Sequence, residues 1–240
     1  MKRVLVTGAG GFVGRELVSL LARSGYCGVA TGRRPPENIP AGFEAAGRDD
    51  VLDGRIPLEA IDSIVHLEVK HHVMNPDARA VSEIEAVNVG GTCDWLDWAS
   101  AQHIPQFILA SSVKAVRAEA GSTLETALPE ASDPYGRSKA RAEGAVRGWA
   151  AADPRRGAVI LRFAPVYGPG NIANLSDFAR QVLRGHPCFV GHGQTRKSVV
   201  SLRNATAAIE WALRNSLTGC EVFNGSDPTT YSIGELATMI

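Results

Sequence analysis

The sequence predicts an α/β fold built on a doubly wound parallel sheet, and three patterns indicate it. Short β-branched or aliphatic runs alternate with longer segments of helical periodicity, which is typical of βαβ units. A glycine-rich turn joins the first such run to the first helical segment. No internal repeat or low-complexity tract interrupts the alternation. Together these patterns indicate a Rossmann-like architecture.

The elements of this sheet domain follow from local residue types. Helical periodicity begins near Phe12, Ala78 and Pro134. Proline suits the first turn of a helix, because the N–H group that it lacks has no helical partner there. The runs that we expect to form strands are Arg3–Thr7, Gly28–Thr31, Ser63–Leu67, Gln106–Ala110 and Ala158–Arg162.

The predicted helices and strands become shorter after the Gly-Pro-Gly stretch that begins at Gly168. We therefore expect a domain of residues 1–165 and a small C-terminal lobe of residues 166–240, interleaved with the first. The sequence stops within an apparent helix, so we expect a short lobe or a piece of a longer protein. The elements predicted for this part are a helix at Leu175–Arg184, a strand at Ser198–Ser201, a helix at Ala205–Asn215 and a strand at Val222–Asn224.

Composition restricts the class of protein. The chain has 240 residues with 25 basic and 25 acidic side chains, so no global field attracts nucleic acid or an anionic membrane. The four cysteines are far apart and form no Cys-x-x-Cys pair, which speaks against a zinc site or a disulfide framework. The apolar N-terminal run is too short and too polar for a signal peptide or a membrane span. We expect a cytoplasmic protein with neither nucleic acid nor membrane as partner.

Residues 7–14, TGAGGFVG, lie between the first strand and the first helix. Glycine is needed in such a turn because the backbone must approach a pyrophosphate without a Cβ atom in the way. The following helix N-terminus offers free N–H groups and partial positive charge to phosphate. The sequence therefore predicts a dinucleotide site, with contacts from Gly8, Gly11, Phe12, Val13 and Gly14.

The end of the second strand bears on the choice of dinucleotide. An Asp or Glu is expected there if the ligand is NAD, because a carboxylate holds the ribose hydroxyls. This chain has Gly32 followed by Arg33 and Arg34. Room and two cations suit a 2′-phosphate, so NADP is favoured over NAD. The alternative is that both arginines are ordinary solvated loop residues.

Tyr135 and Lys139 lie one helical turn apart, which places them on one face of the helix that begins at Pro134. An ammonium group near a phenol stabilises the phenolate, so such a tyrosine can act as general base toward a hydroxyl and as general acid toward a ketone. Ser111 and Ser112 end a predicted strand, where ligands bind in these folds. Capping of the strand end is the alternative role for them.

Taken in order, these motifs resemble the extended short-chain dehydrogenase/reductases, in particular the NAD(P)-dependent nucleotide-sugar epimerase/dehydratase group. Beyond the glycine loop and Tyr135-x-x-x-Lys139, the similar segments are Val65-His66-Leu67, Asn88-Val89-x-Gly91-Thr92, Ser111-Ser112 and Arg162-Phe163-x-Pro165-x-Tyr167-Gly168-Pro169-Gly170.

The resemblance implies a role for each matching residue. Tyr135 would be the acid/base, Lys139 would bind the nicotinamide ribose and lower the tyrosine pKa, and Ser112 would orient the substrate hydroxyl. It implies a nucleotide-sugar substrate and a homodimer that pairs helices at Ala78–Gln102 and Pro134–Ala150. Further cofactor contacts implied are Asp49 or Asp50 near adenine, Leu67 and Phe163; further substrate contacts are Ser111, Asn174 and Arg196.

The chain also departs from this family. Glu68-Val69 follows His66-Leu67, where members usually have small residues beneath the cofactor, so Glu68 puts cofactor affinity in question. The segment Gln194–Ser198 resembles the basic strand with which family members contact the substrate diphosphate. An acidic residue often follows that strand, and this chain has Arg203 there instead.

The resemblance leaves the reaction open. A 4-epimerase takes a hydride from the sugar and returns it, whereas a 4-ketosugar reductase consumes NADPH. A 4,6-dehydratase needs an additional acid and base beside the catalytic serine, and the segment Val113-Lys114-Ala115 lacks them, so it ranks last. We therefore expect an NAD(P)-dependent epimerase or reductase of a nucleotide sugar, acting at C4. A non-catalytic NADP(H) sensor is the alternative from another class.

Overall fold

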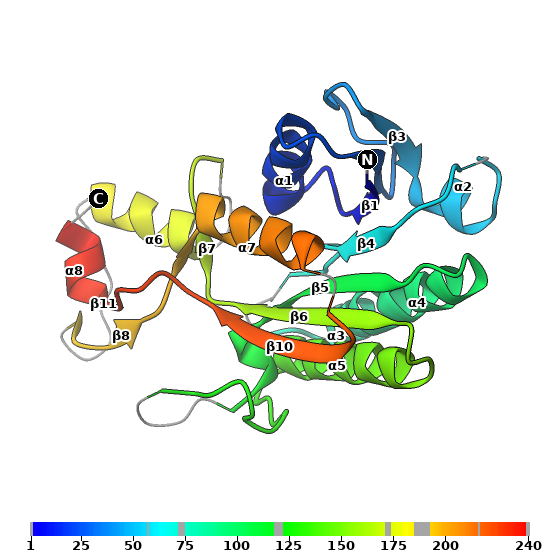
Figure 1. The fold of residues 1–240 in the computed structure, drawn as a ribbon. Helices are drawn as coiled ribbons and strands as arrows, with labels where there is room; N and C mark the ends of the chain where they lie inside the picture. Colours follow the sequence, from blue (N-terminus) through cyan, green and yellow to red (C-terminus); the bar gives the residue numbers. More distant parts are fainter. Residues whose placement is uncertain are drawn as a thin grey trace.

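The structure is a computed structural model, and Figure 1 shows its fold. None of the helices within the described part of the chain has the length and apolar character needed to cross a membrane. The structure describes residues 2–56, 58–71, 75–117, 122–170, 174–184, 193–215 and 217–238.

A seven-stranded sheet forms the centre of the molecule, with the strand order β10-β6-β5-β4-β1-β2-β3. All neighbouring strands of this sheet are parallel. The order reverses direction between β1 and β4, so the predicted doubly wound parallel sheet is confirmed. The strands are β1 (Arg3–Thr7), β2 (Cys27–Gly32), β3 (Phe43–Gly47), β4 (Ser63–His66), β5 (Gln106–Ser112), β6 (Gly157–Phe163) and β10 (Gly219–Gly225).

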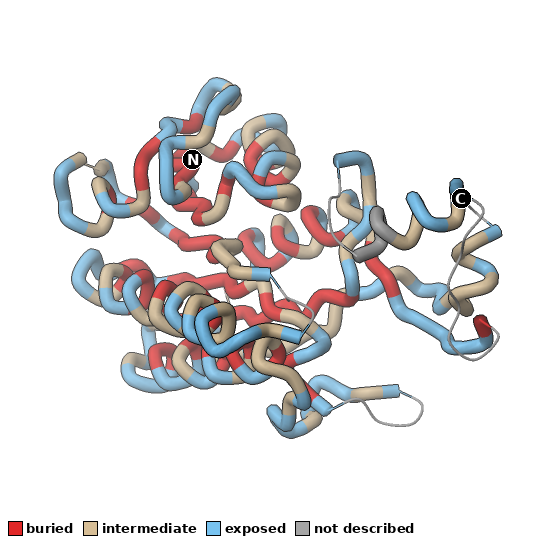
Figure 2. The backbone as a smooth tube through the Cα atoms, turned by 180° about the vertical axis from the view of Figure 1, so that it is seen from behind, coloured by how far each residue is buried: buried red, intermediate tan, exposed pale blue. Residues whose placement is uncertain are grey.

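Helices cover both faces of the sheet, and Figure 2 shows the buried backbone between them. On one face α1 (Phe12–Arg23) and α7 (Leu202–Arg214) pack on residues such as Val4 and Val6. On the other face three helices pack on the intervening residues such as Leu5. Side chains of a strand alternate between faces, so a strand covered on both sides is apolar throughout. The three helices are α2 (Arg48–Leu52), α4 (Gly91–Ala101) and α5 (Pro134–Ala151).

The helix α3 (Ala78–Glu85) continues into α4 through a π-helical turn at Ala86–Gly90. The side chain of Asp77 caps α3 by accepting from the N–H of Ala80, and Asp133 caps α5 by accepting from the N–H of Gly136. The predicted helix starts at Phe12, Ala78 and Pro134 are therefore confirmed.

Two small sheets lie outside the central one. The strands β7 (Val166–Tyr167) and β9 (Val200–Ser201) pair in parallel, and β8 (Arg196–Lys197) pairs antiparallel with β11 (Tyr231–Ser232). Figure 1 shows β8, β11 and the helices α6 (Asn174–Leu183) and α8 (Ile233–Thr238) beside one end of the central sheet.

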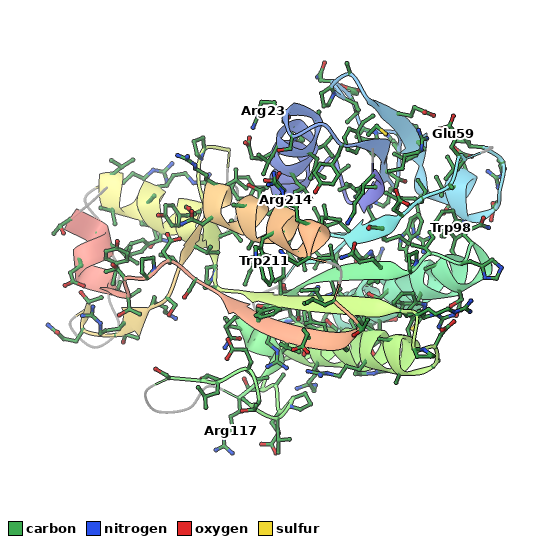
Figure 3. The ribbon with its side chains drawn as sticks, viewed as in Figure 1. Arg23, Glu59, Trp98, Arg117, Trp211 and Arg214 are labelled. Atoms are coloured by element: carbon green, nitrogen blue, oxygen red, sulfur yellow. The ribbon has the colours of Figure 1, made fainter. Side chains whose placement is uncertain are left out.

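Not all of the C-terminal part lies in this peripheral region. The strand β10 pairs with β6 as an edge strand of the central sheet. Trp211 of α7 meets Phe223 of β10 edge to face, with ring centroids 5.3 Å apart. Figure 3 labels Trp211 on α7. Elements of residues 166–240 therefore contribute to the central sheet, while the division at residue 165 and the interleaved lobe stay predictions.

The register of the sheet brings the predicted site segments to one edge. Thr7 of β1 lies beside Thr31 of β2 and His66 of β4, and Ser112 of β5 lies beside Phe163 of β6. These residues stand at the carboxyl ends of parallel strands, where ligands bind in open α/β sheets.

Phe107 of β5 is fully buried between the rings of His66 and Trp149, each with centroids 5.8 Å away. We expect Phe107→Ala to lower the free energy of unfolding by about 3–5 kcal/mol, because it removes buried area and leaves a cavity. The control Leu128→Ala alters a side chain that is 71% exposed and should change it by less than about 0.5 kcal/mol. Urea denaturation measures both; equal effects would show that β5 is not part of the core.

Candidate active site

The glycine loop packs tightly against the end of β4. Gly8 has a φ of +64°, and a Cβ atom there would lie 2.9 Å from the backbone nitrogen of Glu68. A Cβ atom at Gly14 would overlap the backbone of Gly8 and Ala9. Gly11 precedes α1 without a side-chain cap, so N–H groups of the first helical turn have no side-chain partner. This cradle fits the pyrophosphate of a dinucleotide.

Tyr135 and Ser112 come together at the carboxyl edge of the sheet, as the sequence predicts. Burial raises the pKa of Tyr135 to about 12, while the hydrogen bond with the Ser112 side chain acts to lower it and the charge of Asp133 acts to raise it. The Ser112 hydroxyl also accepts from the N–H of Lys114 at 3.2 Å. The phenol is therefore protonated at neutral pH in the protein by itself.

Lys139 lies on the same side of α5 as Tyr135, and its side chain is buried. Its ammonium group donates to the carbonyl of Ala110 at 2.7 Å. Burial lowers the pKa of Lys139 to about 8, although the charge of Glu143 acts to raise it. That Lys139 lowers the Tyr135 pKa stays a prediction, since the contact given for its ammonium is a backbone carbonyl.

Ser111 points to the other side of β5 from Ser112. Its hydroxyl donates to the carboxylate of Glu143 at 2.6 Å. Glu143 also pairs with Arg162 at 2.7 Å, and the two charged side chains are 2% and 1% exposed. Nη1 of Arg162 donates to the carbonyl of Glu125 at 3.0 Å. Ser111 is thus part of a buried polar network, and Ser112 is the serine that faces Tyr135.

A buried histidine joins β1, β4 and α4. Thr92 Oγ1 donates to the carbonyl of Asn88 at 2.7 Å, so it accepts from His66 Nε2 at 3.2 Å. Thr7 Oγ1 accepts from the N–H of Leu67 at 3.1 Å and donates to His66 Nδ1 at 2.8 Å. These partners assign a neutral imidazole that carries its proton on Nε2.

The network continues through the π-helical turn to α5, the helix that carries Tyr135. The Asn88 side-chain nitrogen donates to Ser138 Oγ at 2.9 Å, and Ser138 Oγ donates to the carbonyl of Tyr135 at 2.7 Å. The Asn88 amide also accepts from the backbone N–H of Lys70 and donates to its carbonyl. Asn88 and Ser138 thus support the site, although the sequence analysis assigned no role to either. The segment Asn88-Val89-x-Gly91-Thr92 pointed to Asn88 alone.

The arginines after β2 are exposed and form no hydrogen bond or ion pair with any described residue. Arg33 and Arg34 therefore remain free to meet a ligand. Asp49 and Asp50 lie in the first turn of α2, at the same edge of the sheet. Asp49 pairs with Arg48 at 3.2 Å and Asp50 with Arg55 at 3.1 Å.

The remaining predicted residues are dispersed. Leu67 packs on the core beside α1, and Phe163 ends β6 with its ring against Gly225. Arg196 lies in β8, where it donates to Thr230 Oγ1 at 3.1 Å and pairs with Glu235 at 3.6 Å. Asn174 begins α6, and its side chain lies outside the described residues.

The fold and the glycine cradle are typical of dinucleotide-dependent enzymes, and a buried phenol that bonds a serine hydroxyl suits acid/base chemistry on hydroxyl and keto groups. The model of the NAD dependent epimerase/dehydratase family matches residues 4–234. The chain belongs to this family.

Several relatives place the chain within that family. It is 32% identical to UDP-glucose 4-epimerase of Vibrio cholerae, over 98% of this chain and 74% of the relative. It is 31% identical to ceramide reductase of Caulobacter vibrioides, over 90% of this chain and 62% of that protein. The solved structure of MoeE5 in complex with UDP-glucose and NAD superposes with a TM-score of 0.86 and 28% identity, over 99% of this chain and 80% of that one.

Folding stability should depend on the pH through His66. Burial lowers its pKa to about 3, with the charges of Lys139 and Arg48 contributing. The unfolded chain therefore binds a proton first as the pH falls through about 6.5, and this costs ~2 kcal/mol of stability between pH 7 and pH 5. Urea denaturation at both pH values measures the loss. In His66→Gln the decrease should be smaller by about that amount; an unchanged decrease would contradict the neutral imidazole.

Proposed function

We propose that the protein is an NAD(P)-dependent oxidoreductase or epimerase of a nucleotide-activated sugar that transfers hydride at C4, with Tyr135 as the acid/base. The hydrogen bond between Ser112 and Tyr135 at the carboxyl edge of the sheet carries this proposal. UDP-glucose in the MoeE5 structure and the activity named for the Vibrio relative support the substrate class.

The dinucleotide would lie across the glycine loop and the carboxyl ends of β1, β2 and β4, and when bound it supplies the hydride acceptor or donor. The residues of the chain handle the proton. Ser112 orients the substrate oxygen and Tyr135 exchanges a proton with it. Lys139 brings a buried cation to the same helix face.

The raised pKa of Tyr135 favours donation of a proton over its removal from the substrate. A phenol with a pKa of about 12 can donate to the oxygen of a ketone at neutral pH. To act as a base at pH 7 it needs stabilisation of the phenolate by ~7 kcal/mol. Positive charge must therefore come near the phenol in the bound state, and we assign this role to Lys139, a buried cation one helical turn along α5.

The second candidate is an NADPH-dependent reductase of a 4-ketosugar. Arg33 and Arg34 favour it, because they are exposed and uncommitted beside Gly32. The similarity to a ceramide reductase also supports net reduction. A titration with NAD and NADP, followed by addition of UDP-, GDP- and dTDP-sugars, separates the candidates. Net oxidation of NADPH by a ketosugar selects the reductase. Interconversion of epimers with no net oxidation of NADPH selects the epimerase. The homodimer and the cytoplasmic location stay predictions.

Tyr135→Phe should lower kcat by about 10²–10⁴ because it removes the proton donor, while dinucleotide affinity changes little. Steady-state kinetics with the nucleotide sugar found in the panel measures kcat, and calorimetry measures affinity. The control is Tyr26→Phe, since Tyr26 directly precedes β2 and so lies at the opposite edge of the sheet. An unchanged kcat in Tyr135→Phe would contradict the proposed mechanism.

Arg33→Ala combined with Arg34→Ala should weaken NADP binding by about tenfold or more and NAD binding by much less, because only NADP carries a 2′-phosphate. Calorimetric titration of the double variant with each dinucleotide measures the difference. Replacing the exposed Arg23 and Arg155 by alanine removes the same charge elsewhere and serves as the control. Equal weakening of NAD and NADP by the first pair would refute the clamp.

A further inference from the structure

Glu68 lies directly beneath the glycine loop. Its backbone nitrogen is the atom that a Cβ atom on Gly8 would meet at 2.9 Å, and its N–H donates to Thr7 Oγ1 at 3.3 Å. The loop above it is the cradle for the pyrophosphate, whose two negative charges a nearby free carboxylate would repel. The position of the Glu68 carboxylate therefore matters for any dinucleotide bound on this loop.

The Glu68 side chain turns away from the loop toward the helices on the opposite face of the sheet. Its carboxylate accepts from Trp95 Nε1 of α4 at 3.1 Å and pairs with Arg48 of α2 at 3.4 Å. The side chain is 15% exposed. A carboxylate in such a place is stable only with a paired cation and hydrogen bonds.

Arg48 supplies this cation and is itself held in place. Its guanidinium also pairs with Asp94 at 2.5 Å and with Asp49 at 3.2 Å. Burial acts to lower the pKa of Arg48, but the hydrogen bond with Asp94 and the charge of Glu68 outweigh it and leave the pKa raised. Arg48 thus carries its charge under all ordinary conditions, among three carboxylates from the segment after β4, from α2 and from α4.

We propose that Arg48 is a positioning residue for dinucleotide binding, which holds the carboxylate of Glu68 against Trp95 and so keeps it turned away from the glycine loop. The inference rests on the dinucleotide binding in the proposed function, and it concerns affinity rather than proton transfer. It implies that Arg48 is needed only because Glu68 is charged.

Calorimetric titration with NAD and with NADP tests this dependence. Arg48→Met should weaken binding of both dinucleotides by about tenfold or more, because the Glu68 carboxylate loses its cation and is no longer held away from the pyrophosphate. The double variant Arg48→Met with Glu68→Gln should return to within about threefold of the unaltered chain. Arg48→Lys keeps the charge and should retain most of the affinity. Arg155→Met is the matched control, since Arg155 is exposed and pairs only with Asp153 among the contacts described.

Each result decides the matter. Unchanged affinity in Arg48→Met, or equal weakening in the single and double variants, would overturn the inference, because Arg48 would then act through packing or not at all. Thermal unfolding of each variant, followed by circular dichroism, identifies folded samples. If Arg48→Met does not fold, Arg48→Gln replaces it in the same comparison of single and double variants, with the same expected results. Absence of dinucleotide binding by the unaltered chain would instead overturn the proposed function as well.

Discussion

The hydrogen bonds of the His66 imidazole connect the glycine loop to the helix that follows the π-helical turn. His66 bonds Thr7 at the end of β1 and Thr92 in α4, and the carbonyl of Asn88 receives the Thr92 hydroxyl. The Asn88 side chain then reaches Ser138 in α5. Because each of these groups is buried, a broken bond leaves a donor or acceptor without water, which costs about 1–3 kcal/mol. The loop and the helix of Tyr135 are therefore held in one arrangement.

The buried charged groups near the site also have hydrogen-bond partners. Glu143 is shared by Arg162 and Ser111, and Lys139 donates to the carbonyl of Ala110. Such networks stiffen a site when all their members are bonded, and they are costly when one is not. The neutral His66 fits this pattern, since two cations act on it and burial disfavours its charged form. The π-helical turn is a local irregularity that aims Asn88 at both Lys70 and Ser138.

Local patterns were sufficient for most of the central sheet. The strand at Arg3–Thr7 is found as predicted, and the other expected strands differ only at their ends. β3 was missed because Phe43–Gly47 is short and rich in alanine and glycine, so it has no apolar run that indicates a strand. Pairing with β2 makes it a strand. The strand expected at Val222–Asn224 became β10 of the central sheet, since pairing partners depend on contacts distant in sequence.

The fold class, the glycine loop, the helix starts and the Tyr135–Lys139 spacing could be predicted without a structure, because they depend on backbone geometry and on neighbours within a few residues. The directions of the side chains depend on packing between distant elements. The fold turned Ser111 toward Glu143 and directed Lys139 to Ala110. It also paired Glu68 with Arg48, 20 residues earlier in the numbering, so that its charge is balanced. A single sequence records no such pairing, because the energy of a buried charge depends on partners that only folding brings within reach.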